Sequence, residues 1–197
     1  LGQPIQLSNT SYIPSLTDTM SYSWSVPGGI PSSSSQRFPT FNFLVADTFL
    51  ATLIVRSSRG CSDTVQQPVI VHPPPLADFS APRFCSGSSG VLTNLSSSPA
   101  GGQITSYQWS IPGGPPSNSS SANPSVVFQQ SDTFNVSLIV TNTTGCRDTV
   151  VRPVIVSANP TASFNASSIC LGQSFSLQNN STIQPAGDTV YYSWSFT

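Results

Sequence analysis

The chain has 197 residues, of which only 7% are charged, and its formal net charge at pH 7 is −1. The sequence contains no Lys and no Glu, so all formal charge comes from arginine and aspartate. Without a basic field, nucleic acids and anionic membrane surfaces are not expected partners. The hydrophobic content of 37% is too high for a disordered linker, and the scarcity of helix formers predicts an all-β, secreted kind of chain.

The sequence repeats itself every 85 residues without a gap. Trp24, Trp109 and Trp194 are each 85 residues apart, and Cys61 and Cys85 recur as Cys146 and Cys170. We therefore expect three repeats: residues 1–72 lacking a first strand, a complete repeat at 73–157, and the N-terminal part of a third at 158–197. Both ends are expected to be cuts through a longer protein. No apolar run is long enough to span a membrane.

Short strands with period-two alternation follow one another within each repeat. In chain order they are expected around Leu7, Trp24, Asp47–Val55 and Gly60–Val71, then around Leu92, Tyr107–Ile111, Asp132–Val140 and Gly145–Val156, then around Leu177 and Trp194. Such strands, punctuated by Gly, Pro, Asn and Ser, predict one β-sandwich per repeat, with the three tryptophans as central core residues. The proline-bearing joints His72–Phe79 and Ser157–Phe164 are expected to be short and stiff, which gives an extended array.

An ordered set of short motifs resembles tandem PKD (polycystic kidney disease) domains. The motifs are P-x-A-x-F at Pro75–Phe79, C-x-G at Cys85–Gly87, Y-x-W-S at Tyr107–Ser110, the run Asp132–Asn142, and G-C-x-D-T at Gly145–Thr149. The closest resemblance is to large secreted surface proteins of Bacteroidota, including gliding-type adhesins. It implies Ig-like sandwiches that serve as spacer or adhesive modules at the cell surface. The family often has W-x-F-G-D-G where this chain has WSVPGG and WSIPGG, so the acidic residue of a calcium site is missing there.

The sequence contains few residues that could form a catalytic or metal-binding site. His72 is the single histidine and its counterpart is Ser157, so a Cys-His pair at Cys61 has no equivalent at Cys146. The cysteines lack the close C-x-x-C spacing of zinc sites, and the seven aspartates are scattered rather than clustered as calcium requires. We expect no enzyme activity and no cofactor. Calcium is not favoured.

Disulfides are the preferred interpretation of Cys61, Cys85, Cys146 and Cys170 in a secreted chain. We expect Cys85 to pair with Cys146 inside the complete repeat. The alternative is a bond from one repeat to the next, because an Ig-like topology places these two positions at opposite poles. In that case each pairing needs a cysteine outside this sequence.

Six of the seven aspartates are followed by threonine, which is typical of turns, since Asp caps nearby backbone groups. The resemblance to Bacteroidota proteins gives a second interpretation. Their O-glycans are attached at Asp-Ser/Thr before a small or aliphatic residue, which makes Thr19, Thr64, Thr149 and Thr189 candidate glycosylation sites. Covalent glycans would help to keep so weakly charged a surface soluble.

The expected function is that of a non-catalytic structural repeat of a long extracellular protein, as a stalk, adhesin shaft or surface filament. Its expected partners are the neighbouring repeats, with self-assembly into fibres or a surface glycan or protein ligand as further candidates. The alternative is a carbohydrate- or protein-binding module attached to a secreted enzyme or adhesin. Tyr12 and Phe38 would serve that alternative, because they lack aromatic counterparts one repeat later.

Overall fold

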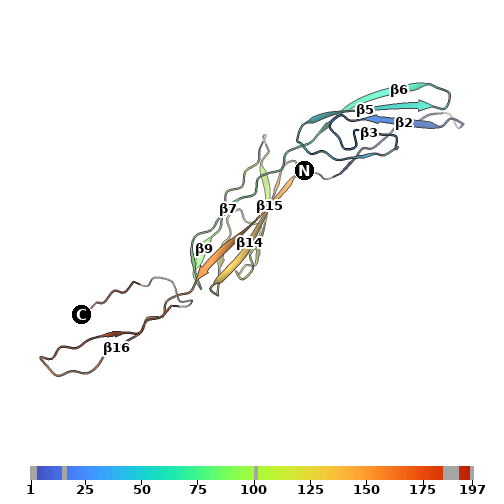
Figure 1. The fold of residues 1–197 in the computed structure, drawn as a ribbon. Helices are drawn as coiled ribbons and strands as arrows, with labels where there is room; N and C mark the ends of the chain where they lie inside the picture. The colour runs from blue at the N-terminus through green and yellow to red at the C-terminus, as the bar shows by residue number, and fades with distance from the viewer. Residues whose placement is uncertain (1–3, 15–16, 100–101, 184–190, 196–197) are drawn as a thin grey trace. The chain divides into compact units, whose positions relative to one another are not determined.

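The computed structural model describes residues 4–14, 17–99, 102–183 and 191–195, and every regular element in them is a β-strand (Figure 1). The predicted all-β class is therefore confirmed. No helix in the described residues is long and apolar enough to cross a membrane. The chain forms two units. The first contains Leu1–Pro75, Ser98–Gly102 and Thr143–Cys146, and the second contains Leu76–Ser97, Gln103–Asn142 and Arg147–Thr197.

The first unit is built on an antiparallel sheet with the strand order β3-β2-β5-β6. These strands are β2 (Met20–Ser25), β3 (Ser33–Ser34), β5 (Thr48–Ser57) and β6 (Ser62–Ile70), and a separate pair is formed by β1 (Ile5–Gln6) and β4 (Thr40–Phe41). In β5 the side chains alternate as predicted, since Ala51 and Leu53 are buried while Leu50 is exposed. They pack with Trp24 and Phe41 in the core of this unit.

The complete repeat forms most of the second unit and has the architecture of a sandwich. One sheet has the order β12-β11-β14-β15-β8, and the opposite layer consists of the pairs β10-β7 and β13-β9. The strands are β7 (Phe79–Ser80), β8 (Phe84–Cys85), β9 (Ser89–Val91), β10 (Thr93–Asn94), β11 (Ile104–Ser110), β12 (Asn118–Ser119), β13 (Ser125–Val127), β14 (Asp132–Asn142) and β15 (Arg147–Ser157).

Both layers contribute to one core in the complete repeat. Trp109 on β11 is 2% exposed and meets Phe79 of the opposite layer edge-on, with ring centroids 5.1 Å apart. Its indole Nε1 donates a hydrogen bond to the carbonyl of Ser121 at 2.9 Å, so the one polar atom of the ring is satisfied. Trp24 in the first unit is buried in the same way and donates to the carbonyl of Gln36 at 3.0 Å.

The described part of residues 158–197 contains only β16 (Phe164–Asn165) and β17 (Gln178–Asn179), which pair with each other. Trp194, expected to be a core residue, is 44% exposed. It packs edge-on against Phe164 at 5.4 Å between ring centroids. The reason is that the described residues here form no sheet like the one that covers Trp109.

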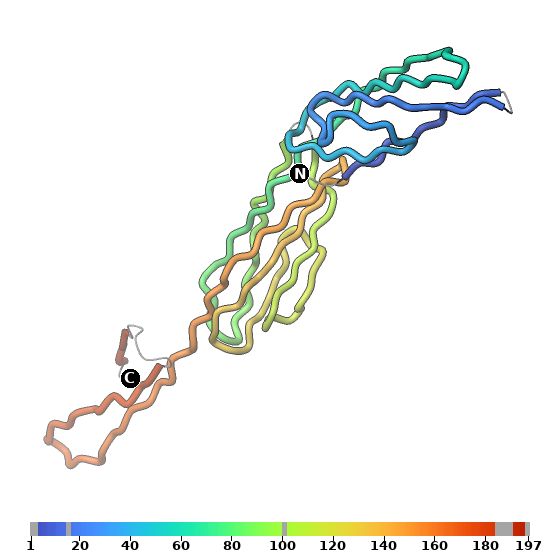
Figure 2. Tube along the Cα trace, turned by 45° about the vertical axis from the view of Figure 1, so that its right-hand side comes forward, coloured from blue at the N-terminus to red at the C-terminus, as the bar shows by residue number. Residues whose placement is uncertain are grey.

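The last strand of the complete repeat has neighbours on both sides. β15 pairs along its length with β14 in an antiparallel register, and at its end it pairs in parallel with β8 through Val156 and Ser157. Figure 2 shows the green trace that leads into β8 running beside the orange trace of β15. Because β8 and β15 pair in parallel at the edge of the sheet, an early and a late segment of the complete repeat run side by side in the same direction.

We predict different costs for alanine at two glycines with similar backbone conformation. Gly113 and Gly145 have φ of +74° and +81°, a region that costs an L-residue about 1–2 kcal/mol. A Cβ at Gly113 would also overlap the ring of Phe134, whereas one at Gly145 would meet nothing within 4 Å. Gly113→Ala should therefore destabilise the protein by about 1–3 kcal/mol more than Gly145→Ala in urea unfolding. Equal losses would contradict the packing of Phe134 over Gly113.

Candidate functional site

The candidate catalytic and metal-binding groups are not brought together. In residues 4–14, 17–99, 102–183 and 191–195, no group of three His, Cys, Asp or Glu side chains could hold a metal ion. Three Asp-Thr pairs instead lie at the starts of the strands β5, β6 and β14 rather than in turns. The Oδ1 atoms of Asp47, Asp63 and Asp132 each accept a hydrogen bond from the backbone N–H of the next threonine, at 2.7, 2.8 and 2.7 Å.

The structure separates Cys85 from Cys146, so the pairing expected inside the complete repeat is wrong. Cys85 lies beside Ser157 at the end of β15, while Cys146 immediately precedes Arg147 at its start. Eleven residues of extended strand span about 35 Å, whereas a disulfide needs Cα atoms within about 7 Å. The Cys146 Sγ atom lies 3.8 Å from the carbonyl oxygen of His72. Cys61, Cys85 and Cys170 are exposed free thiols, and a bond between repeats stays a prediction.

The candidate glycosylation sites in the described residues are accessible. Thr19, Thr64 and Thr149 are exposed, and Thr189 lies outside the described residues. The candidate ligand-binding aromatics of the first unit are also at the surface, with Tyr12 83% and Phe38 45% exposed. The Arg37 guanidinium lies 5.2 Å from the centroid of the Phe38 ring, so one face of that ring is occupied.

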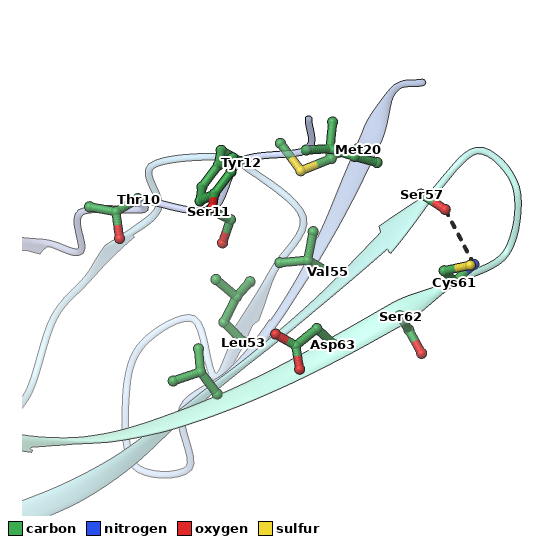
Figure 3. A pocket seen from close by; sticks show the side chains of 12 residues that line it. Thr10, Ser11, Tyr12, Met20, Leu53, Val55, Ser57, Cys61, Ser62 and Asp63 are labelled. Atoms are coloured by element: carbon green, nitrogen blue, oxygen red, sulfur yellow. Dashed lines mark hydrogen bonds between the residues drawn. The ribbon is translucent and has the colours of Figure 1, made fainter. Parts of the chain in front are cut away.

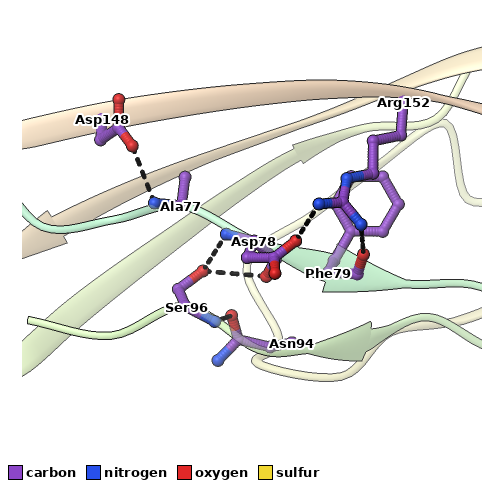
Figure 4. Close-up of polar contacts among 7 residues, drawn as sticks. All are labelled: Ala77, Asp78, Phe79, Asn94, Ser96, Asp148 and Arg152. Carbon is purple, nitrogen blue, oxygen red and sulfur yellow. Dashed lines mark hydrogen bonds and ion pairs between the residues drawn. The ribbon is translucent and has the colours of Figure 1, made fainter.

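The most elaborate polar arrangement holds residues Leu76–Ser80, which we call the leading segment, against β15. The Asp148 carboxylate accepts a hydrogen bond from the Ala77 N–H at 2.8 Å (Figure 4). Arg152 forms an ion pair with Asp78 at 2.6 Å and donates to the carbonyl of Phe79 at 2.9 Å. We call Asp148 and Arg152 the anchor, because both reach from β15 to the backbone of the leading segment.

The other side of the leading segment is fixed by residues that follow β10. Leu76 and Ser97 exchange two backbone hydrogen bonds of 2.8 and 3.0 Å. The Ser96 hydroxyl accepts from the Asp78 N–H at 3.0 Å and lies 3.1 Å from the Asp78 carbonyl, to which it donates. On the inner side, Phe79 is 1% exposed and packs on Trp109. The leading segment is therefore held on three sides.

The anchor was not among the predicted sites, although the sequence contains a signal for it. Side chains at even positions of β15 share one face, on which Val154 and Val156 are buried in the core. Asp148 and Arg152 lie in the same phase and therefore point to the core side of the sheet. Polar residues in phase with buried valines indicate a polar partner on that face. Only the fold shows that the partner is the leading segment.

The first unit contains an open groove between residues Ser8–Tyr12 and strand β6. Two adjoining cavities of about 410 and 390 Å³ share Thr10, Ser11, Leu53 and Val65 as lining residues. Figure 3 shows Thr10, Ser11 and Tyr12 on one side of the larger cavity and Asp63 of β6 on the other. The groove is continuous, because the same four residues border both cavities.

Comparison with known proteins identifies a family for the middle of the chain. Residues 72–156 match the family model described as PKD domain. The chain is similar to the PKD1 domain of Vibrio anguillarum Epp, at 27% identity and a TM-score of 0.40, over 45% of this chain and 99% of that one. It is also similar to the PKD1 domain from the Vibrio cholerae metalloprotease PrtV, at 30% identity and a TM-score of 0.37, over 43% and 98% of the two chains.

A third solved structure extends over more of the chain. The fibronectin(III)-like modules of Clostridium thermocellum CbhA match at 14% identity and a TM-score of 0.42, over 80% of this chain and 87% of theirs. The comparison with curated proteins gave no match.

We predict that peptide mapping under non-reducing conditions will find no peptides joined through Cys85 and Cys146, because β15 separates them. Iodoacetamide should modify Cys85 in the folded protein, since this cysteine is exposed. Cys61 and Cys170, which are also exposed, serve as internal controls for reagent access. Recovery of a Cys85–Cys146 cross-linked peptide from unheated protein would contradict the strand assignment.

Proposed function

We propose, on the premise that residues 72–156 carry a PKD domain, that this chain is a non-catalytic structural part of a secreted protein. In this proposal its repeats transmit tension along a stalk, an adhesin shaft or a surface filament. The observation that carries the proposal is the parallel course of the leading segment and β15 in the complete repeat.

The contacts between the two segments advance in the same direction. Ala77 meets Asp148, and Phe79 meets Arg152. Further on, Phe84 pairs with Val156 and Cys85 with Ser157. The chain therefore passes into the domain beside the start of β15 and leaves at the end of β15. Tension between these two points pulls the segments past each other along their own axes.

This direction of load is mechanically favourable. When two neighbouring strands are pulled past each other, the bonds between them are stretched together rather than one after another. The anchor adds side-chain contacts between β15 and the leading segment. The end of that segment, β7, pairs with β10 in the other layer. Phe79 must also leave the core before the segment can slide, and burial of a phenylalanine is worth about 1.5–3 kcal/mol.

The surface of the chain agrees with a structural role. With few charges and many hydroxyl and amide groups, it offers no strong field for a charged substrate. Neighbouring repeats are the first proposed partners, and glycans at Thr19, Thr64 or Thr149 would extend outward from exposed positions. Export to the cell surface is part of the same proposal.

The binding-module alternative depends on Tyr12 and Phe38. The Arg37 guanidinium lies over one face of the Phe38 ring, which leaves less aromatic surface available to a sugar. Tyr12 lies at the edge of the groove rather than on an open platform. These two positions support the structural function over sugar recognition, and a glycan array that shows specific binding lost in Tyr12→Ala would reverse this preference.

We predict that Arg152→Ala lowers the force at which the complete repeat unfolds when the chain is pulled from its two ends. The anchor contact is partly exposed, so its equilibrium contribution is about 1 kcal/mol, from the ion pair and the contact with the Phe79 ring. Asp148→Ala should have a similar or larger effect, of about 1–3 kcal/mol, because it leaves the Ala77 N–H without its acceptor.

Arg147→Ala is the matched control, because Arg147 is exposed at the start of the same strand and lies outside the anchor. Single-molecule force spectroscopy would give the unfolding force, and urea unfolding the equilibrium stability. If Arg152→Ala and Arg147→Ala unfolded at the same force as the unmodified chain, the anchor would not bear load.

A further inference from the structure

We propose that Pro153 prevents the exposed edge of β15 from pairing with the same edge of a second copy of this chain. The edge belongs to the complete repeat, whose residues 73–157 all lie within the sequence. The proposal concerns contact between molecules that lie side by side. It is separate from the load-bearing role of the repeat, which concerns contacts within one molecule.

Most of the outer edge of β15 has no neighbouring strand. On one side, β15 pairs with β14 from Arg147 to Val156 without a shift in register. On the other side, pairing with β8 is confined to Val156 and Ser157. The leading segment does not pair with the rest of this edge, because its strand β7 pairs with β10. In the part of the chain that the structure describes, the edge from Arg147 to Pro153 therefore pairs with no strand.

The backbone of Pro153 faces this open edge. Along an antiparallel strand, the N–H and C=O of one residue point to one side, and those of the next residue point to the other. The Ser157 carbonyl accepts a hydrogen bond from the Ser86 N–H at 2.9 Å, so Ser157 is in the phase that faces β8. The unbroken register carries this phase back to Pro153, Val151 and Thr149. At Pro153 the outward N–H donor is therefore missing.

The first repeat has a proline at the corresponding position. Pro68 on β6 lies 85 residues before Pro153. The Val71 N–H donates to the Asp47 carbonyl at 2.9 Å, so odd-numbered residues of β6 bond toward β5. Pro68 lies in the opposite phase, and its ring nitrogen therefore faces away from β5. In both repeats the proline leaves the ladder with the antiparallel neighbour intact, which is where a sheet tolerates this residue.

The residues around Pro153 would otherwise form a strand that associates readily. Apart from Arg152 and Pro153, the run Val150–Val156 consists of valine and isoleucine, and Val151 is 58% exposed. Sheet edges are commonly protected by charged side chains, above all lysine, but this sequence has no Lys. Arg152 is engaged in the ion pair with Asp78. A proline at a position that needs no hydrogen bond is the remaining means of protection in this run.

The pairing that Pro153 excludes is a symmetric contact between two copies. When two β15 edges meet in antiparallel orientation about Val151, Thr149 of each copy lies opposite Pro153 of the other. The same surface is used by both copies, so the contact would close as a dimer with one continuous sheet. The missing N–H of each proline leaves the opposite Thr149 carbonyl without a donor. The dimer thus loses a hydrogen bond at each end of the contact.

The test is the molar mass of Pro153→Val over a wide concentration range, measured by sedimentation beside the unmodified chain. Valine restores the outward N–H, so the variant should dimerise at a roughly ten- to hundredfold lower concentration. Its stability in urea should match that of the unmodified chain, because no bond to β14 is changed. Loss of folding in Pro153→Val would contradict the outward placement of residue 153.

Two further variants separate the position of the proline from composition. Val151→Pro combined with Pro153→Val moves the proline to the preceding edge-facing position, keeps the composition, and should restore the behaviour of the unmodified chain. Pro112→Val makes the same change in an exposed turn and is the matched control, which should leave association unchanged. A folded Pro153→Val chain whose mass follows that of the unmodified chain at every concentration would overturn the proposal.

Amide hydrogen exchange locates the contact on the strand. In the dilute unmodified chain, the Val150 and Val154 N–H groups, directed at β14, should exchange slowly, whereas those of Thr149 and Val151 should exchange quickly. In the Pro153→Val dimer, Thr149 and Val151 should become protected. Equal protection of Val150 and Val151 in the dilute unmodified chain would overturn the open edge. Dimerisation without new protection at Thr149 and Val151 would place the contact elsewhere and would also overturn the proposal.

Discussion

The parallel placement of the leading segment beside β15 is the constraint on which the complete repeat depends. It closes the sandwich, because Phe79 then reaches Trp109 from the opposite layer. It also explains why β15 carries Asp148 and Arg152 in phase with buried valines, a pattern that would be unfavourable on a purely apolar face. The same contact sets the direction in which a pulling force would act. The leading segment and β15 are parallel, so a force on the two ends of the repeat would pull them past each other along the strand axis.

The leading segment supplies partners for the side of β15 that faces it. With the segment in place, the Asp148 carboxylate accepts a hydrogen bond from the Ala77 N–H, and Val150 is partly buried against the core. The polar and the apolar side chains of β15 on this face are therefore both accounted for by one contact.

The sequence predicted the features that depend on local pattern. Period-two alternation and the 85-residue register were enough to place Trp24 and Trp109 in the core and to predict the class. Features that depend on which segments meet were not predictable in this way. The Cys85–Cys146 pair failed because β15 keeps its two ends apart, which is the separation that the alternative based on an Ig-like topology had implied. The repeat pattern did not predict the anchor, because the residue that corresponds to Arg152 in the first repeat is the uncharged Gln67.

Amide hydrogen exchange of the whole chain, resolved to single residues, tests the role of the leading segment most directly. The Leu76 N–H donates to the Ser97 carbonyl and the Ala77 N–H to Asp148, so both should exchange as slowly as the buried backbone of β14 around Val136. Arg152→Ala should speed exchange at Ala77 while leaving Val136 protected. Exchange of Leu76 and Ala77 at the rate of an unstructured peptide, in a chain whose β14 remains protected, would contradict the account.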